Sequence, residues 1–274
     1  GYTGVALTGT GAANYAIADT AQGAGTITQR ALTLGEVTAQ TKTYDGTRAA
    51  DTSKFQATLG NLVAGEENLF TATATGAAYN SKDVRAANTV SYTGVALGGT
   101  GAGNYTLAAT TAQGAGAITR RALTVDTVAA QTKTYDGTTA ADASQFRAAL
   151  AGAIAGDNVT AAATGASYND KNVAAANRID YTGVALAGAD AGNYSLAATT
   201  AQGAGTITRR ALTLGAVGTQ TKTYDGTTTA DASQFRATLN NVVTGEENSV
   251  TATAAGAAYN DKNVARANAV GYTG

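Results

Sequence analysis

Five residue types are absent from the 274-residue chain: cysteine, histidine, proline, methionine and tryptophan. Without histidine and cysteine, the chain cannot build a Ser-His-Asp triad, a cysteine nucleophile or a His/Cys zinc site. Without cysteine, its stability outside a cell must come from packing and hydrogen bonds rather than from disulfides. The sequence therefore favours a protein that is not an enzyme, with no catalytic residues, no cofactor and no metal site.

Charge and long apolar runs are also scarce. Lysine and arginine total 18 and aspartate and glutamate 19, which gives a net charge of -1 at pH 7. Because phosphate binding needs a basic surface, we expect no nucleic-acid partner. No apolar run approaches the roughly 20 residues of a membrane span, so we expect no membrane insertion. Aromatic residues make up only 6% of the chain, and each should supply a large share of a buried core.

The chain is instead rich in repetition. The sequence Lys-Thr-Tyr-Asp-Gly-Thr occurs three times, with its tyrosine at Tyr44, Tyr135 and Tyr224. Three further motifs keep the same interval of about 90 residues: Asn-Tyr at Tyr15, Tyr105 and Tyr194; Tyr-Thr-Gly at Tyr2, Tyr92, Tyr181 and Tyr272; and Tyr-Asn at Tyr79, Tyr168 and Tyr259. The period is longer than that of common solenoid units and matches a small domain.

The phase of these motifs predicts four segments. Residues 1–29 carry the carboxy-terminal part of a repeat, called here the amino-terminal segment. Residues 30–119 and 120–208 are complete repeats, the first and second copies. Residues 209–274 carry the amino-terminal part of a repeat, the third copy. Only two or three residues join one repeat to the next, which favours an extended and fairly stiff rod.

Short strands separated by turn signals are expected within each repeat. In the second copy the alternating or threonine-rich stretches are 122–125, 131–135, 159–164, 179–186, 194–198 and 206–208. Glycines 203 and 205 are expected to interrupt the strand before the last of these stretches. The stretch 142–154 is typical of a short capped helix or of an extended segment. The pattern predicts an all-β fold of tandem immunoglobulin-like β-sandwiches, or alternatively β-grasp-like repeats with one short helix.

The tyrosine motifs are interpreted as structural. In Tyr-Asp-Gly, the tyrosine should pack in the core, Asp-Gly should turn the chain, and the preceding lysine should face water. The tyrosine of the Asn-Tyr motif should occupy a corner with its hydroxyl bonded back to the backbone. The structural motif residues are thus Tyr44, Asp45, Gly46, Tyr135, Asp136, Gly137, Tyr224, Asp225, Gly226, Tyr15, Tyr105 and Tyr194.

Two chemical alternatives stay open at this point. Lys42, Lys133 and Lys222 lie on an early strand and Asn14, Asn104 and Asn193 on a late one, so a lysine–asparagine isopeptide cross-link is conceivable. It requires a buried carboxyl between the pair, and no carboxyl aligns in all copies. The acidic turns near 157 and 170 offer one or two carboxylates each, whereas calcium takes six to eight oxygens.

The ordered motifs resemble a known family. Lys-Thr-Tyr-Asp-Gly-Thr is followed by Gly-Glu-Glu-Asn or Gly-Asp-Asn, Tyr-Asn-Asp-Lys-Asn-Val, Tyr-Thr-Gly-Val-Ala-Leu, Gly-Asn-Tyr-Ser-Leu and Ile-Thr-Arg-Arg. This order is similar to the YDG-type repeats of large bacterial surface adhesins, which resemble filamentous haemagglutinin in overall plan. The resemblance covers essentially the whole chain. It implies secretion to the Gram-negative outer surface and a stalk used in adhesion and biofilm formation, with no receptor specified.

We therefore expect the structural stalk of an extracellular adhesin, with neighbouring repeats or head-to-tail copies of the same protein as partners. The alternative is a module that binds glycan or matrix through its repeat loops. Exposed aromatic side chains in the loops would favour the binding module, and buried tyrosines the stalk. The amino-terminal segment and the third copy are complementary parts of one repeat, so we also expect one to complete the other between chains or along a longer filament.

Overall fold

The computed structural model describes all residues, 1–274, and divides into two compact units, residues 1–121 and 122–274. Regular structure consists of strands together with three-residue 3-10 turns. No helix is long and apolar enough to cross a bilayer. The prediction of an all-β chain of tandem repeats is confirmed, and the helical structure in each copy is limited to three-residue 3-10 turns.

The amino-terminal segment has little regular structure. It holds one antiparallel pair of two-residue strands and one 3-10 turn: β1 (Tyr2–Thr3), η1 (Ala12–Asn14) and β2 (Thr20–Ala21). Its large apolar side chains are exposed, with Tyr15 76% and Ile27 100% accessible. The segment therefore has no core of its own.

The first copy forms three sheets, ordered β10-β3-β5, β4-β11-β8-β7 and β6-β9. Two of the pairings are parallel, β10 with β3 and β11 with β4. Its elements are β3 (Arg30–Val37), β4 (Gln40–Thr43), η2 (Thr52–Lys54), β5 (Ala57–Gly60), β6 (Phe70–Thr73), β7 (Gly76–Tyr79), β8 (Thr89–Thr93), β9 (Ala96–Gly99), η3 (Ala102–Asn104), β10 (Tyr105–Leu107) and β11 (Thr111–Thr119).

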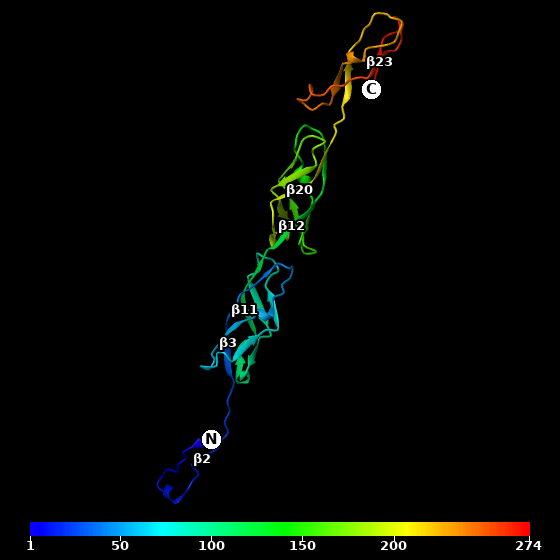
Figure 1. The fold of residues 1–274 in the computed structure, drawn as a ribbon. Helices are drawn as coiled ribbons and strands as arrows, with labels where there is room; N and C mark the ends of the chain where they lie inside the picture. The colour runs from blue at the N-terminus through cyan, green and yellow to red at the C-terminus, as the bar shows by residue number, and fades with distance from the viewer. The chain divides into compact units, whose positions relative to one another are not determined.

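The second copy repeats this plan, with sheets β14-β12-β19, β13-β20-β17-β16 and β15-β18. Figure 1 labels β3 and β11 of the first copy and β12 and β20 of the second. The elements are β12 (Arg121–Val128), β13 (Gln131–Thr134), η4 (Ala143–Gln145), β14 (Ala148–Ala151), β15 (Thr160–Ala162), β16 (Gly165–Tyr168), β17 (Arg178–Thr182), β18 (Ala185–Ala187), η5 (Ala191–Asn193), β19 (Tyr194–Leu196) and β20 (Thr200–Thr208).

One core cluster joins the sheets of the second copy. Its buried members come from the four-stranded sheet and its flanks, and include Tyr168, Ile179, Tyr181 and Ile207. Val128 and Leu196 of the β14-β12-β19 sheet and Ala161 of β15 pack against it. Because the sheets share this cluster, the copy is a sandwich whose centre is built mainly from tyrosine and isoleucine.

The third copy contains fewer elements. They are β21 (Thr213–Val217), η6 (Ala232–Gln234), β22 (Ala237–Asn240), β23 (Gly256–Tyr259) and β24 (Val270–Thr273). These strands form two antiparallel pairs, β21 with β22 and β23 with β24. Residues 220–223, which correspond to strand β13 of the second copy, are not in a strand.

Two local predictions need correction. Glycines 203 and 205 do not interrupt the strand, because β20 is continuous from Thr200 to Thr208. A Cβ on Gly203 would lie 2.9 Å from Val128, and one on Gly205 would lie 2.6 Å from Ile179. These glycines let neighbouring side chains pack against the strand backbone, a known use of glycine within strands.

The stretch 179–186 is not one strand but two, because Gly183 turns the backbone with φ +61° between β17 and β18. The proposed helix after Asp142 is a single 3-10 turn, η4, capped by the Asp142 side chain, which accepts from the Ser144 N–H. The chain then becomes extended at Phe146, whose ring packs 4.7 Å from that of Tyr181.

Candidate functional site

The lysine of the repeated Lys-Thr-Tyr-Asp-Gly-Thr motif makes four hydrogen bonds in the second copy. Lys133 Nζ donates to Asp136 Oδ1 at 2.8 Å, to the carbonyl oxygens of Thr138 and Ala140 at 2.9 Å each, and to Thr138 Oγ1 at 3.1 Å. Its side chain is only 18% exposed. The expectation that this lysine faces water is wrong, because the Asp-Gly turn places four backbone and side-chain oxygens around the ammonium group.

The same arrangement, called here the lysine cradle, occurs in all three copies. Lys42 bonds Asp45 at 2.7 Å, and Lys222 bonds Asp225 at 2.9 Å. The three ammonium groups also lie 5.3 to 5.4 Å from the ring centroids of Tyr79, Tyr168 and Tyr259, within cation–π range. The repeated motif therefore builds a local polar structure that joins the Asp-Gly turn to the Tyr-Asn motif.

Electrostatics at the lysine cradle favour the charged carboxylate. The hydrogen bond from Lys133 lowers the pKa of Asp136 from 3.8 to about 2, with the amide and hydroxyl of Thr138 adding to the effect. The bond from Lys222 does the same for Asp225, again to about 2. With its donors occupied by these oxygens, the ammonium group is held as a structural cation.

The glycine of the motif is needed for its backbone conformation. Gly46, Gly137 and Gly226 have φ values of +78°, +80° and +79°, in the region that L-residues with side chains avoid. Asp136 Oδ1 also accepts from the Thr138 N–H at 2.9 Å, which closes the turn. The Asp-Gly pair thus sets the turn that forms the lysine cradle.

The tyrosines of the Asn-Tyr motif lie at a different point of the fold. Tyr194 is 2% exposed, and its hydroxyl accepts from the Ile154 N–H at 3.0 Å and donates to Asp157 Oδ2 at 2.6 Å. In the first copy the Tyr105 hydroxyl accepts from Val63 N–H at 3.3 Å and donates to Glu66. Each hydroxyl thus ties the start of a late strand to a turn about 40 residues earlier.

One buried group was not singled out from the sequence. Gln131 is 6% exposed, and its Nε2 donates to the Tyr181 hydroxyl at 2.8 Å and to the Asp142 carbonyl at 3.0 Å. Gln40 makes the equivalent bonds to Tyr92 and Asp51, both at 3.0 Å. Its recurrence in the sequence could have identified it, because a glutamine stands two residues before the motif lysine in every copy.

The YDG domain family matches residues 28–112, 119–201 and 208–274. The chain belongs to the YDG domain family. Comparison with curated proteins and with solved structures gave no match. The lysine cradle lies within the matched residues in each of the three YDG copies.

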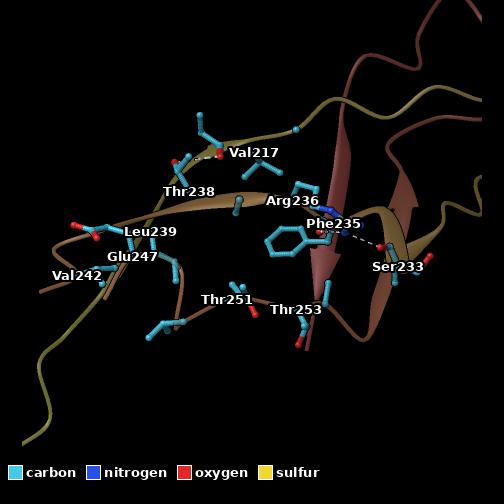
Figure 2. A pocket seen from close by; sticks show the side chains of 17 residues that line it. Val217, Ser233, Phe235, Arg236, Thr238, Leu239, Val242, Glu247, Thr251 and Thr253 are labelled. Carbon is cyan, nitrogen blue, oxygen red and sulfur yellow. Dashed lines mark hydrogen bonds between the residues drawn. The ribbon is translucent and has the colours of Figure 1, made fainter. Parts of the chain in front are cut away.

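The third YDG copy exposes a groove of about 1000 Å³ (Figure 2). Its apolar lining includes Val217, Phe235, Leu239, Val242 and Val250. Figure 2 shows the Phe235 ring projecting between the strand that carries Thr238 and the segment that carries Thr251 and Thr253. Val217 is 42% exposed, whereas its counterpart Val128 in the second YDG copy packs against the core.

The motif residues of the incomplete parts are placed differently from those of the complete YDG copies. Tyr224 is 60% exposed and Tyr15 is 76% exposed. Tyr44 is fully buried, and Tyr135 is partly buried against the second-copy core. No group of three or more acidic side chains gathers closely enough to share a metal ion.

Proposed function

We propose that these YDG copies form a structural stalk of a secreted bacterial adhesin, holding another part of the protein away from the outer surface of a Gram-negative cell. The stalk has no catalytic step. Each complete copy folds around its own core, and the copies follow one another with almost no linker: one residue separates β11 from β12. Repeated copies with short joins suit a protein whose role is to span distance.

Burial of the aromatic rings is the observation that carries this proposal. In the first and second copies all tyrosine and phenylalanine side chains except that of Tyr135 are buried, at 8% exposure or less: Tyr44, Phe55, Phe70, Tyr79, Tyr92, Tyr105, Phe146, Tyr168, Tyr181 and Tyr194. Sugar recognition needs exposed aromatic faces on which a pyranose ring can stack. The burial therefore supports a spacer over a glycan- or matrix-binding module.

We also propose that the neighbours of a copy are further copies, either along one chain or head to tail between chains. Three residues of the third-copy groove, Val217, Phe235 and Val250, correspond to second-copy residues that share one core cluster with Leu196 of β19 and Ile207 of β20. The amino-terminal segment carries the sequence equivalents of those strands, with Ile17 corresponding to Leu196 and Ile27 to Ile207. Ile17 is 50% exposed, so both halves of the contact present apolar surface.

Cell-surface display tests the spacer function. The 274-residue chain is placed between a surface anchor and an epitope tag, once, twice or three times, and the height of the tag above the cell is measured by super-resolution microscopy. The height should increase by an equal step with each insertion. Flexible glycine-serine linkers of the same lengths are the control, and their height should grow more slowly, roughly as the square root of length.

The binding alternative has its own readout. The soluble chain is applied to arrays of glycans and matrix proteins. Saturable binding that is lost on substitution of loop residues, with tag heights no greater than those of the flexible linkers, would overturn the spacer function.

A further inference from the structure

Tyr135 of the second copy makes a contact that its place in the Tyr-Asp-Gly turn does not require. Its ring packs against the second-copy core, but its hydroxyl donates to Glu246 Oε1 of the third copy at 2.6 Å. The hydrogen bond with Glu246 raises the pKa of the Tyr135 hydroxyl. The equivalent Tyr224, which has no following copy within this chain, is 60% exposed.

Two further contacts surround this hydrogen bond. Lys171 Nζ lies 3.4 Å from Glu246 Oε1, and the two side chains are 47% and 27% exposed. A Cβ placed on Gly137 would lie 2.9 Å from Val243 Cγ1, so the backbone of the turn lies directly against the valine. A cavity of about 330 Å³ at this junction is lined by Tyr135, Val173, Leu212, Val242, Val243 and Val250.

The carboxylate on the third-copy side recurs along the chain. Glu66 and Asp157 stand at the equivalent position and accept from Tyr105 and Tyr194 of their own copies. A carboxylate has two oxygens and about four lone-pair sites, so it can accept a hydroxyl from its own copy and another from its neighbour. The carboxylate position can therefore connect the interior of one copy to the preceding copy.

We propose that the Tyr-Asp-Gly turn of the second copy is a docking surface for the segment Val242–Val250 of the following copy. The hydroxyl of Tyr135 supplies the polar contact to Glu246, and the bare backbone at Gly137 supplies the apolar contact to Val243. The motif then has two roles: its lysine, aspartate and threonine hold the turn, and its tyrosine and glycine hold the next copy. This contact between copies does not depend on the proposed stalk function.

Zero-length cross-linking tests the contact in the unaltered 274-residue chain. A carbodiimide joins an amine to a carboxylate only when the two are in contact. We expect a Lys171–Glu246 product by mass spectrometry of the monomer. The Lys222–Asp225 pair, 2.9 Å apart within the third copy, is the internal positive control. Formation of the control product without the Lys171–Glu246 product would overturn the proposal. Glu246→Gln should remove the product and Glu247→Gln should retain it, which assigns the carboxylate.

A matched pair of variants isolates the role of the tyrosine hydroxyl. Tyr135→Phe keeps the ring in the core but removes the donor, and the yield of the Lys171–Glu246 product should fall about fivefold, as expected for the loss of one hydrogen bond of typical net strength. Tyr224→Phe removes the corresponding exposed hydroxyl and should leave the yield unchanged. Equal yields from both variants and the unaltered chain would show that the hydroxyl does not hold the junction.

Discussion

The second and third copies contain the same early motifs but differ in how far those motifs are buried. The ring centroids of Phe146 and Tyr181 are 4.7 Å apart with planes at 58°, and those of Phe235 and Tyr272 have the same separation and angle. Yet Tyr181 is 1% exposed, whereas Tyr272 is partly exposed. The local geometry thus forms in both copies, and full burial requires strands that follow the Tyr-Thr-Gly motif.

The comparison separates two kinds of interaction. The lysine cradle involves residues only a few positions apart, and it is the same in both copies. The core needs β18 to β20, which only the second copy has, and without them a groove remains open beside Phe235. The polar turn structure of these two copies is therefore local, whereas their apolar burial depends on the late strands.

The largest expected effect comes from truncating a core tyrosine in the closed copy. Tyr181→Ala should destabilise the second copy by about 3–5 kcal/mol, because a fully buried aromatic ring is replaced by a cavity. Tyr272→Ala should cost clearly less, because its ring is partly solvated already. Hydrogen exchange at the amides of β17 and β24 measures each copy separately. Equal losses in both would mean that the late strands add nothing to the tyrosine's burial.

The next effect is completion of the open groove by another copy of the chain. At concentrations about 100 times the dissociation constant, this association should stabilise the third copy by about 2.7 kcal/mol. Sedimentation should show head-to-tail oligomers that grow with concentration. Ile17→Asp should abolish them, because a charge would enter an apolar groove. Thr10→Asp changes an exposed loop position and is the control; a monomer at all concentrations would contradict the expectation.

Substitutions at the lysine cradle should have a smaller effect on stability, and the effect should be equal in the second and third copies. Asp136→Ala and Asp225→Ala each remove an acceptor for a lysine, a threonine amide and a threonine hydroxyl. Each should destabilise its own turn to a similar extent, measured as faster hydrogen exchange at the Thr138 and Thr227 amides. A cost confined to the second copy would show that the turn depends on the closed core after all.

Acidification should give the smallest effect. The folded-state pKa values of Asp136 and Asp225 are about 2, below the ordinary 3.8, so their contribution to stability is complete above about pH 4. It should be lost as the pH falls from 4 toward 2, because protonation weakens the bonds from Lys133, Lys222 and the two threonines. Carboxyl carbon chemical shifts followed by NMR would give the two midpoints. A midpoint near 4 for either aspartate would contradict this assignment.

Much of the fold was predictable because the aromatic residues are few and regularly spaced. Tyr92, Tyr181 and Tyr194 belong to motifs that recur at one interval, and they occupy the cores. The Asp-Gly turns were also readable, because positive φ at glycine leaves a clear sequence signature. The continuous strand β20 was not predictable. A glycine such as Gly203 can end a strand or can leave room for a neighbouring side chain such as Val128, and the sequence does not distinguish the two cases.

The lysine cradle and the junction were harder to predict for a different reason. Two of the four oxygens around Lys133 are backbone carbonyls, which every residue possesses, so the pattern of side chains indicates only part of its partners. Glu246 bonds a hydroxyl 111 residues away, on another copy. Such a contact depends on how two folded copies meet, and the periodicity of either copy alone carries no information about it.

The parallel pairings of the first copy have a mechanical consequence. β3 and β4, near the point where the chain enters the copy, lie parallel to β10 and β11, near the point where it leaves. Tension applied to the two ends draws these partners along their length in opposite directions. The ladder from Gln40 to Thr43 against Gly116 to Thr119 is then loaded in shear, so its hydrogen bonds bear the force together instead of opening one after another like a zipper.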